Sequence, residues 1–151
     1  MKATESLGAL GDSRSADLYA ELAGDAALKS NWRVQAAEAL AELDDPRGSE
    51  LCAMLAVDAS FDGIRRMQAV RALTQLDDPR SGDLYAVLAS DPTVSGGIRV
   101  QAATALAALD DPRGRDLYAV LAADTTLDDH WQMRAAAMMV KPNSPDAPLR
   151  F

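Results

Sequence analysis

The sequence has few of the residues on which most catalytic and metal sites depend. Its 151 residues include one cysteine, Cys52, and one histidine, His130. A lone cysteine cannot form an internal disulfide, so nothing indicates an oxidising compartment. One histidine and one cysteine cannot supply the usual ligands of zinc, and a lone histidine matches no catalytic spacing. We therefore expect no metal, no cofactor and no intrinsic catalysis.

Positive charge is also scarce, and no apolar run is long. There are 15 Lys and Arg against 23 Asp and Glu, which gives a net charge of −8. Affinity for nucleic acid or for an anionic membrane depends on basic side chains, so neither partner is expected. The sequence shows neither a membrane span nor the apolar core of a signal peptide. The default expectation is a cytoplasmic protein.

What the sequence does contain is a repeat. The string LDDPR begins at Leu43, Leu76 and Leu109, so the offset is 33 residues both times. One period earlier, the related string LGDSR begins at Leu10. A fixed period of this size is typical of helical-repeat proteins. We expect a repeat domain over 1–141 and a proline-rich tail, divided as half-repeat 1–9, units 10–42, 43–75, 76–108 and 109–141, and tail 142–151.

Each unit is expected to form two helices. Asp45 and Pro46 are typical of an N-cap followed by the first helical position. The same pair recurs as Asp78–Pro79 and Asp111–Pro112. Leucines four residues apart then give the first helix a buried face. The second helix is typified by WRVQAAEALAEL, with a predicted core stripe of Trp32, Ala36, Leu40 and Leu43.

The strings RVQAAEALAELDDPR and RVQAATALAALDDPR resemble the compact HEAT-like repeats of prokaryotic proteins, the PBS-lyase type. The resemblance covers nearly the whole chain and implies an all-α, right-handed solenoid of about four helical hairpins. The ankyrin signature T-P-L-H-x-A and the aromatics of tetratricopeptide repeats are missing. Arg33, Arg66 and Arg99 match the family's arginine, and Gln132 departs from it. The resemblance implies that this arginine bonds to nearby turn aspartates or carbonyls.

Other residues that recur with the period have both a structural and a functional interpretation. The aspartate pairs at 44–45, 77–78 and 110–111 suggest either helix capping or a cation site. Capping is favoured, because calcium loops need oxygen ligands at several closely spaced positions. Tyr19, Tyr85 and Tyr118 suggest either an aromatic binding stripe or a half-buried seam between repeats, and the seam is favoured.

The candidate partner-binding surface lies opposite the predicted core stripe of the second helices. Val34 is about 160° from Ala36 around the helix. Stacked inner helices form the concave surface of a solenoid, and exposed apolar columns tend to mark interaction sites. The alternative, that these side chains only pack against adjacent repeats, stays open. The surface comprises the apolar column Val34, Met67, Val100 and Met133, the neighbouring Gln35, Gln68, Gln101 and Arg134, and the flanking Glu38 and Arg71.

These features predict a non-catalytic scaffold or sensor that binds a protein or peptide on its concave face. The alternative is an enzyme or enzyme subunit of a HEAT-like family, either DNA glycosylase-like or bilin lyase-like. The acidic charge opposes a glycosylase, and no specific lyase motif is recognised. Larger residues at Met138 and Val140, with Leu149 and Phe151 in the tail, predict that the C-terminal end is covered. Either the tail or a second subunit could cover it, so self-association through the repeat ends is a further expectation.

Overall fold

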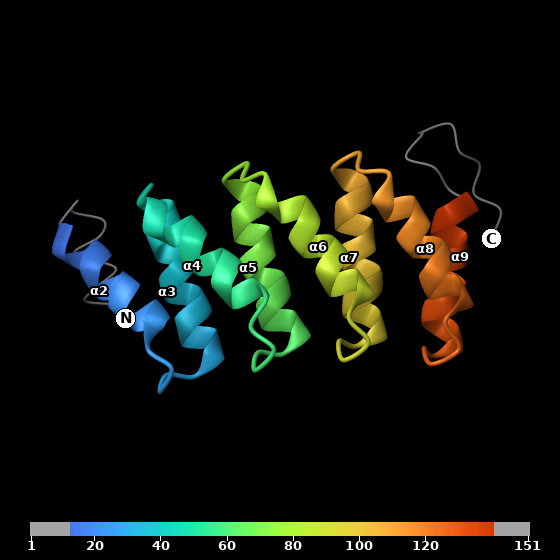
Figure 1. Cartoon of the computed structure of the whole chain (residues 1–151), viewed down its shortest axis with the longest axis horizontal. Coiled ribbons are helices and arrows are strands. Elements are labelled where there is room, and N and C mark those ends of the chain that lie inside the picture. Colours follow the sequence, from blue (N-terminus) through green and yellow to red (C-terminus); the bar gives the residue numbers. More distant parts are fainter. Residues whose placement is uncertain (1–12, 141–151) are drawn as a thin grey trace. The chain divides into compact units, whose positions relative to one another are not determined.

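The computed structural model describes residues 13–140, and that part of the chain is helical with no strand. Its eight helices are α2 (Ser13–Gly24), α3 (Ser30–Glu42), α4 (Pro46–Ala56), α5 (Gly63–Gln75), α6 (Arg80–Ser90), α7 (Gly96–Ala108), α8 (Arg113–Ala123) and α9 (Asp129–Val140). Short connectors join successive helices (Figure 1). The helix bounds place two helices in each predicted repeat unit. The prediction of an all-α chain is confirmed. The half-repeat 1–9 and the tail 142–151 lie outside the described residues.

The chain divides into two compact units, 1–81 and 82–151. In unit 1, α2 packs on α3, α3 on α4 and α4 on α5, and α3 also contacts α5. In unit 2, α7 packs on both α8 and α9, and α8 packs on α9. A second helix such as α3 or α7 is therefore covered by its neighbours on more than one side.

The Asp-Pro-Arg string explains where the first helix of a hairpin begins. Asp45 is the N-cap of α4, its carboxylate accepts a hydrogen bond of 2.9 Å from the backbone N–H of Arg47, and Pro46 opens the helix. Helices α6 and α8 begin one residue later in the string. Asp78 and Asp111 nevertheless accept the same bond from the arginine two residues on. Asp45 is thus confirmed as an N-cap. The prediction that Pro79 and Pro112 occupy the first helical position is wrong by one residue, and Pro112 is itself the N-cap of α8.

The first aspartate of each pair ends the preceding second helix. Asp44, Asp77 and Asp110 have left-handed backbones, with φ of 58°, 55° and 60°. The N–H of Asp44 donates to the carbonyl of Ala41, and the N–H of Asp45 donates to that of Leu40. These two hydrogen bonds form a Schellman motif, and the aspartate pairs at 77–78 and 110–111 repeat it. Both aspartates thus have backbone roles that need no bound cation.

The core differs from the predicted one at several positions. Leu55, Leu88 and Leu121 are buried as expected, and so are Ala36 and Leu40. Trp32, placed in the predicted core stripe, is 42% exposed. The tyrosines are fully rather than half buried, at Tyr19, Tyr85 and Tyr118. The reason is that the second helices pack against several neighbours, so the buried arc is not centred on the stripe that runs from Trp32 to Leu43.

Two glycines let helices approach each other at backbone distance. A Cβ on Gly48 of α4 would lie 2.5 Å from the backbone nitrogen of Ala41 in α3. A Cβ on Gly114 of α8 would lie 2.7 Å from the backbone nitrogen of Ala107 in α7. No side chain fits at either crossing, so glycine sets the spacing between one hairpin and the next within each unit.

Candidate partner-binding surface

The apolar column proposed as an exposed partner site is mostly buried. Val34, Met67 and Val100 are 1%, 2% and 2% exposed, so the prediction that they line an open face is wrong. Helix α3, for example, packs against α2, α4 and α5, which covers side chains on opposite sides of the helix. Met133, the fourth member, is 71% exposed on the last described helix, α9. The interpretation of these side chains as packing residues holds for the first three.

The polar members of the predicted surface remain accessible. Gln35 on α3 and Arg71 on α5 are exposed, and Glu38 and Gln68 are half-buried. In unit 2, Gln101 on α7 and Arg134 on α9 are also exposed. The candidate site is therefore the polar part of the predicted surface without its apolar column.

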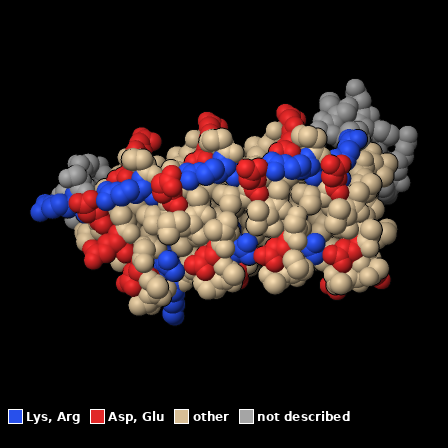
Figure 2. Space-filling view, in the orientation of Figure 1, with Lys and Arg blue, Asp and Glu red and all other residues tan. Residues whose placement is uncertain are grey.

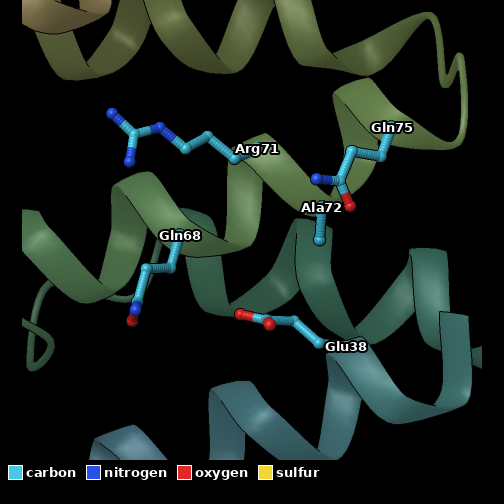
Figure 3. A pocket seen from close by; sticks show the side chains of 5 residues that line it. All are labelled: Glu38, Gln68, Arg71, Ala72 and Gln75. Atoms are coloured by element: carbon cyan, nitrogen blue, oxygen red, sulfur yellow. The ribbon is translucent and has the colours of Figure 1, made fainter. Parts of the chain in front are cut away.

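In unit 1 these side chains meet around a hollow of about 190 Å³ between α3 and α5. It is lined by Glu38 from α3 and by Gln68, Arg71, Ala72 and Gln75 from α5. Figure 3 shows the Glu38 carboxylate reaching across from α3 toward Gln68, whereas the Arg71 side chain extends away from it. Gln75 and Ala72 were not predicted as site residues. Position in the helix was the one sequence feature that could have predicted them, because Ala72 lies one turn along α5 from Gln68 and Gln75 lies one turn from Arg71.

Glu38 carries the least compensated charge in this hollow. Burial raises the pKa of its carboxyl group, and the negative charge of Glu42 raises that pKa further. No hydrogen bond or ion pair joins Glu38 to any residue between 13 and 140. The Gln68 carbonyl accepts a bond of 3.0 Å from Arg65, so the Gln68 amide group is left as a donor. The hollow thus offers a carboxylate acceptor beside a carboxamide donor.

The helix pair α7 and α9 shows that the fold does not require this polar lining. There Thr104 stands at the position of Glu38, and Ala137 at that of Arg71. Met138 stands at the position of Ala72, so a long side chain replaces a methyl group. The Asp-Pro-Arg strings are the same in both units while these positions change. The polar lining formed by Glu38 and its neighbours is therefore particular to unit 1.

The arginine ladder of the second helices is structural, as the resemblance implied. The Nε atoms of Arg33, Arg66 and Arg99 donate to the carbonyls of Ala23, Ala56 and Ala89 at 3.0, 2.8 and 2.9 Å. These carbonyls end the first helices and have no partner within the helix. In the last hairpin Gln132 bonds to the carbonyl of Asp124 instead. The Arg33 guanidinium also lies 5.1 Å from the ring centroid of Phe61.

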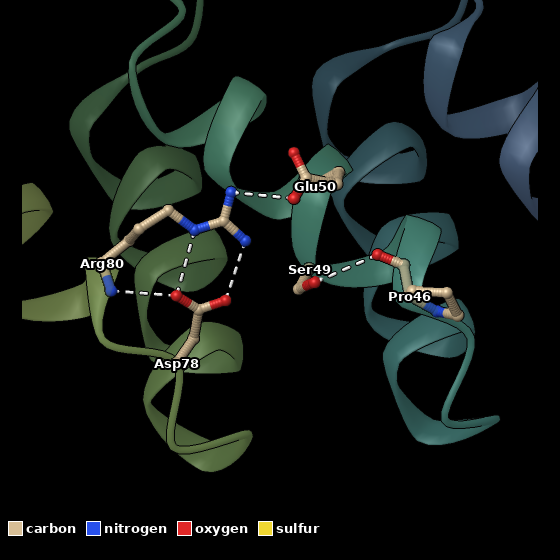
Figure 4. Close-up of polar contacts among 5 residues, drawn as sticks. All are labelled: Pro46, Ser49, Glu50, Asp78 and Arg80. Carbon is tan, nitrogen blue, oxygen red and sulfur yellow. Dashed lines mark hydrogen bonds and ion pairs between the residues drawn. The ribbon is translucent and has the colours of Figure 1, made fainter.

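A second arginine ladder, not recognised from the sequence, belongs to the Asp-Pro-Arg strings. Arg80 bonds through Nη2 to Asp78 at 2.8 Å and through Nη1 to Glu50 on α4 at 3.1 Å (Figure 4). Arg47 joins Asp45 and Asp17 in the same way, and Arg113 joins Asp111 and Asp83. The sequence pattern that could have predicted these ion pairs is an acidic residue 30 positions before each arginine.

These ion pairs surround each arginine of the Asp-Pro-Arg strings with negative charge. Each of the three guanidinium groups is shared between two carboxylates. Hydrogen bonds from the arginine side chains hold the pKa of Asp45, Asp78 and Asp111 below the usual value. Figure 2 shows the result on one face of each unit, where basic atoms lie against acidic atoms.

The one cysteine and the one histidine of the sequence have different surroundings. Cys52 is fully buried, and burial raises the pKa of its thiol to about 12, so the reactive thiolate is absent at neutral pH. His130 is exposed, and its ring centroid lies 4.7 Å from that of Trp131 in an edge-on arrangement. Within residues 13–140 no group of three His, Cys, Asp or Glu is placed to hold a metal ion. No helix in that range has the length and apolar character to cross a membrane.

Unit 2 has a hollow of its own, of about 270 Å³, where α9 meets the start of α7. The Trp131 ring lies over the backbone of Gly96 and Gly97, and a Cβ on Gly97 would be 2.8 Å from it. The tryptophan therefore fills space that two glycines leave. No titratable group converges on it beyond Asp128 at its rim.

Comparison with known proteins adds no relative. No protein-family model, curated protein or solved structure matches the chain.

Proposed function

We propose that this chain is a non-catalytic, cytoplasmic protein-interaction module of the HEAT type, a right-handed solenoid of about four hairpins that acts as a scaffold or sensor. It binds an extended segment of a partner protein along the polar surface of α3 and α5. The observation that supports this proposal is the hollow lined by Glu38, Gln68, Arg71 and Gln75, where side chains from two helices meet at an accessible surface.

The chemistry of the lining suits a peptide. A carboxamide side chain carries both a donor and an acceptor, as a peptide group does, so Gln35, Gln68 and Gln75 are able to bond to main chain of any sequence. An extended peptide also keeps its own backbone groups available, because it makes no internal hydrogen bonds. Affinity then comes from main-chain bonds, and selectivity comes from the side chain that enters the hollow.

The size of the hollow argues against a substrate pocket. Small-molecule sites usually enclose about 300 to 1,000 Å³ and bury most of the ligand. The hollow of unit 1 measures about 190 Å³ and that of unit 2 about 270 Å³. A single side chain fits such a space, whereas a nucleobase with its sugar or a linear tetrapyrrole does not. Neither of these two hollows is therefore large enough to support the enzyme alternative.

A peptide selection tests the proposal. A random peptide library would be panned against the whole chain, and the selected peptides mapped by changes in backbone amide NMR shifts. We expect the largest changes at Gln35, Gln68 and Arg71. Replacing Gln68 and Arg71 together by alanine should weaken peptide binding at least about tenfold. Arg115→Ala, which changes an exposed arginine of α8, should leave peptide binding unchanged. Shifts confined to another surface, or a selection that yields no specific peptide, would refute the proposal.

A further inference from the structure

The hollow between α3 and α5 has one carboxylate, Glu38, and the one cation of its lining, Arg71, extends away from that carboxylate (Figure 3). Glu38 is half-buried and makes no ion pair with residues 13–140, and Glu42 adds a second negative charge nearby. By contrast, Arg47, Arg80 and Arg113 on the first helices are each bonded to two carboxylates. Within residues 13–140, these three arginines are therefore paired with carboxylates, whereas the Glu38 carboxylate is not paired with a cation.

We propose that the hollow binds the cationic side chain of a lysine or arginine in the partner peptide, with the Glu38 carboxylate as its acceptor. This inference rests on the proposed peptide-binding function and specifies the residue that the site selects. A charged hydrogen bond between a cation and a carboxylate is the strong kind of polar contact. Partial burial destabilises the ionised form of Glu38 and so raises the pKa of its carboxyl group. A bound cation would stabilise that ionised form.

The rest of the lining fits a long cationic side chain. Ala72 presents only a methyl group, so the aliphatic stem of lysine or arginine has an apolar surface on which to lie. The Gln75 carboxamide lies on the same side of α5 as Ala72, where its carbonyl oxygen provides a second acceptor (Figure 3). Arg71 extends away from Glu38 in the same view, so it does not occupy the cation's place.

An acidic or uncharged side chain does not fit equally well. A carboxylate in the hollow would face Glu38 at short range with little water between them, and like charges there repel. An uncharged side chain would cover Glu38 without bonding to it, which raises the cost of keeping that carboxylate ionised. The net charge of −8 further attracts a basic segment over an acidic one.

The test uses blocked amino acids as probes of the whole chain. N-acetyl-arginine methylamide should shift the amide signals of Glu38, Gln68 and Gln75 in a saturable way, and the norleucine analogue should not. The Glu38→Gln variant should bind the arginine probe at least about fivefold more weakly. Glu21→Gln, an exposed glutamate on α2, is the matched control and should leave binding unchanged. Thermal unfolding of both variants would verify that the fold is retained.

The two proposals fail in different ways. If selected peptides bind along α3 and α5 but are not enriched in lysine or arginine, and Glu38→Gln does not weaken them, the cation site is refuted and peptide binding stands. If the arginine probe binds at Glu38 but no peptide is selected, peptide binding is refuted and the hollow is a cation site alone. Equal shifts from the norleucine and arginine probes would also overturn the inference.

Discussion

Replacing Gly48 by alanine tests the closest contact in unit 1. The new Cβ would lie 2.5 Å from the nitrogen and 2.8 Å from the Cα of Ala41, and 2.9 Å from the carbonyl carbon of Leu40. All three atoms belong to the backbone of α3, so no flexible side chain is able to move aside. Helix α4 must shift away from α3, which also disturbs the Asp45 cap at its start.

The expected loss of stability follows from two opposing terms. Overpacking of a well-packed contact costs typically about 1 to 3 kcal/mol, and three contacts below 3.0 Å put this site at the upper end. Alanine is the better helix former, by about 1 kcal/mol relative to glycine. The net effect of Gly48→Ala should therefore be a loss of about 2 kcal/mol in the free energy of unfolding.

Urea unfolding followed by tryptophan fluorescence measures this loss. Trp32 lies in unit 1 and Trp131 in unit 2, so a Trp131→Phe background makes the signal specific to unit 1. Gly24→Ala is the matched control, because nothing lies within 4 Å of its Cβ at the end of α2. That variant should be as stable as the parent or slightly more stable. If Gly48→Ala were as stable as Gly24→Ala, the close crossing of α3 and α4 would be wrong.

Three further predictions concern burial, backbone strain and charge. Met67→Asp places a charge in the core and should lower the free energy of unfolding by at least about 3 kcal/mol, whereas Met133→Asp at the same repeat position should change it by less than about 0.5 kcal/mol; equal denaturation midpoints would contradict the burial of Met67. Asp44→Gly should raise the melting temperature, because glycine adopts the left-handed backbone without strain, at a gain of up to about 1 kcal/mol; a lower melting temperature would show that the carboxylate itself stabilises the turn. The pKa of Asp78 is lower in the folded state than its ordinary 3.8, so its contribution is present above that value and is lost as pH falls through the lowered pKa. Asp78→Asn should therefore be less stable at neutral pH and lose less stability on acidification below about pH 4, and parallel pH profiles for variant and parent would refute the linkage.

The amino-acid sequence determined the local structure of this protein. The recurring Asp-Pro at positions such as 45–46 marked the starts of the first helices, because an N-cap and its proline act within a few residues of each other. The structural role of the arginine at Arg33 also followed from the sequence, since it came with the family resemblance and bonds to a carbonyl only ten residues away.

Only the tertiary structure decided which side chains are covered and which remain open. Val34 appeared exposed because a single helix has one side opposite its core stripe, but α3 packs against α2, α4 and α5, and Val34 is buried. The pairing of Arg80 with Glu50 joins residues 30 positions apart, and the hollow at Glu38 depends on how α3 and α5 lie side by side. Caps and local hydrogen bonds join residues that are close in the sequence and can be predicted from it, whereas burial and contacts between distant residues depend on how the helices pack.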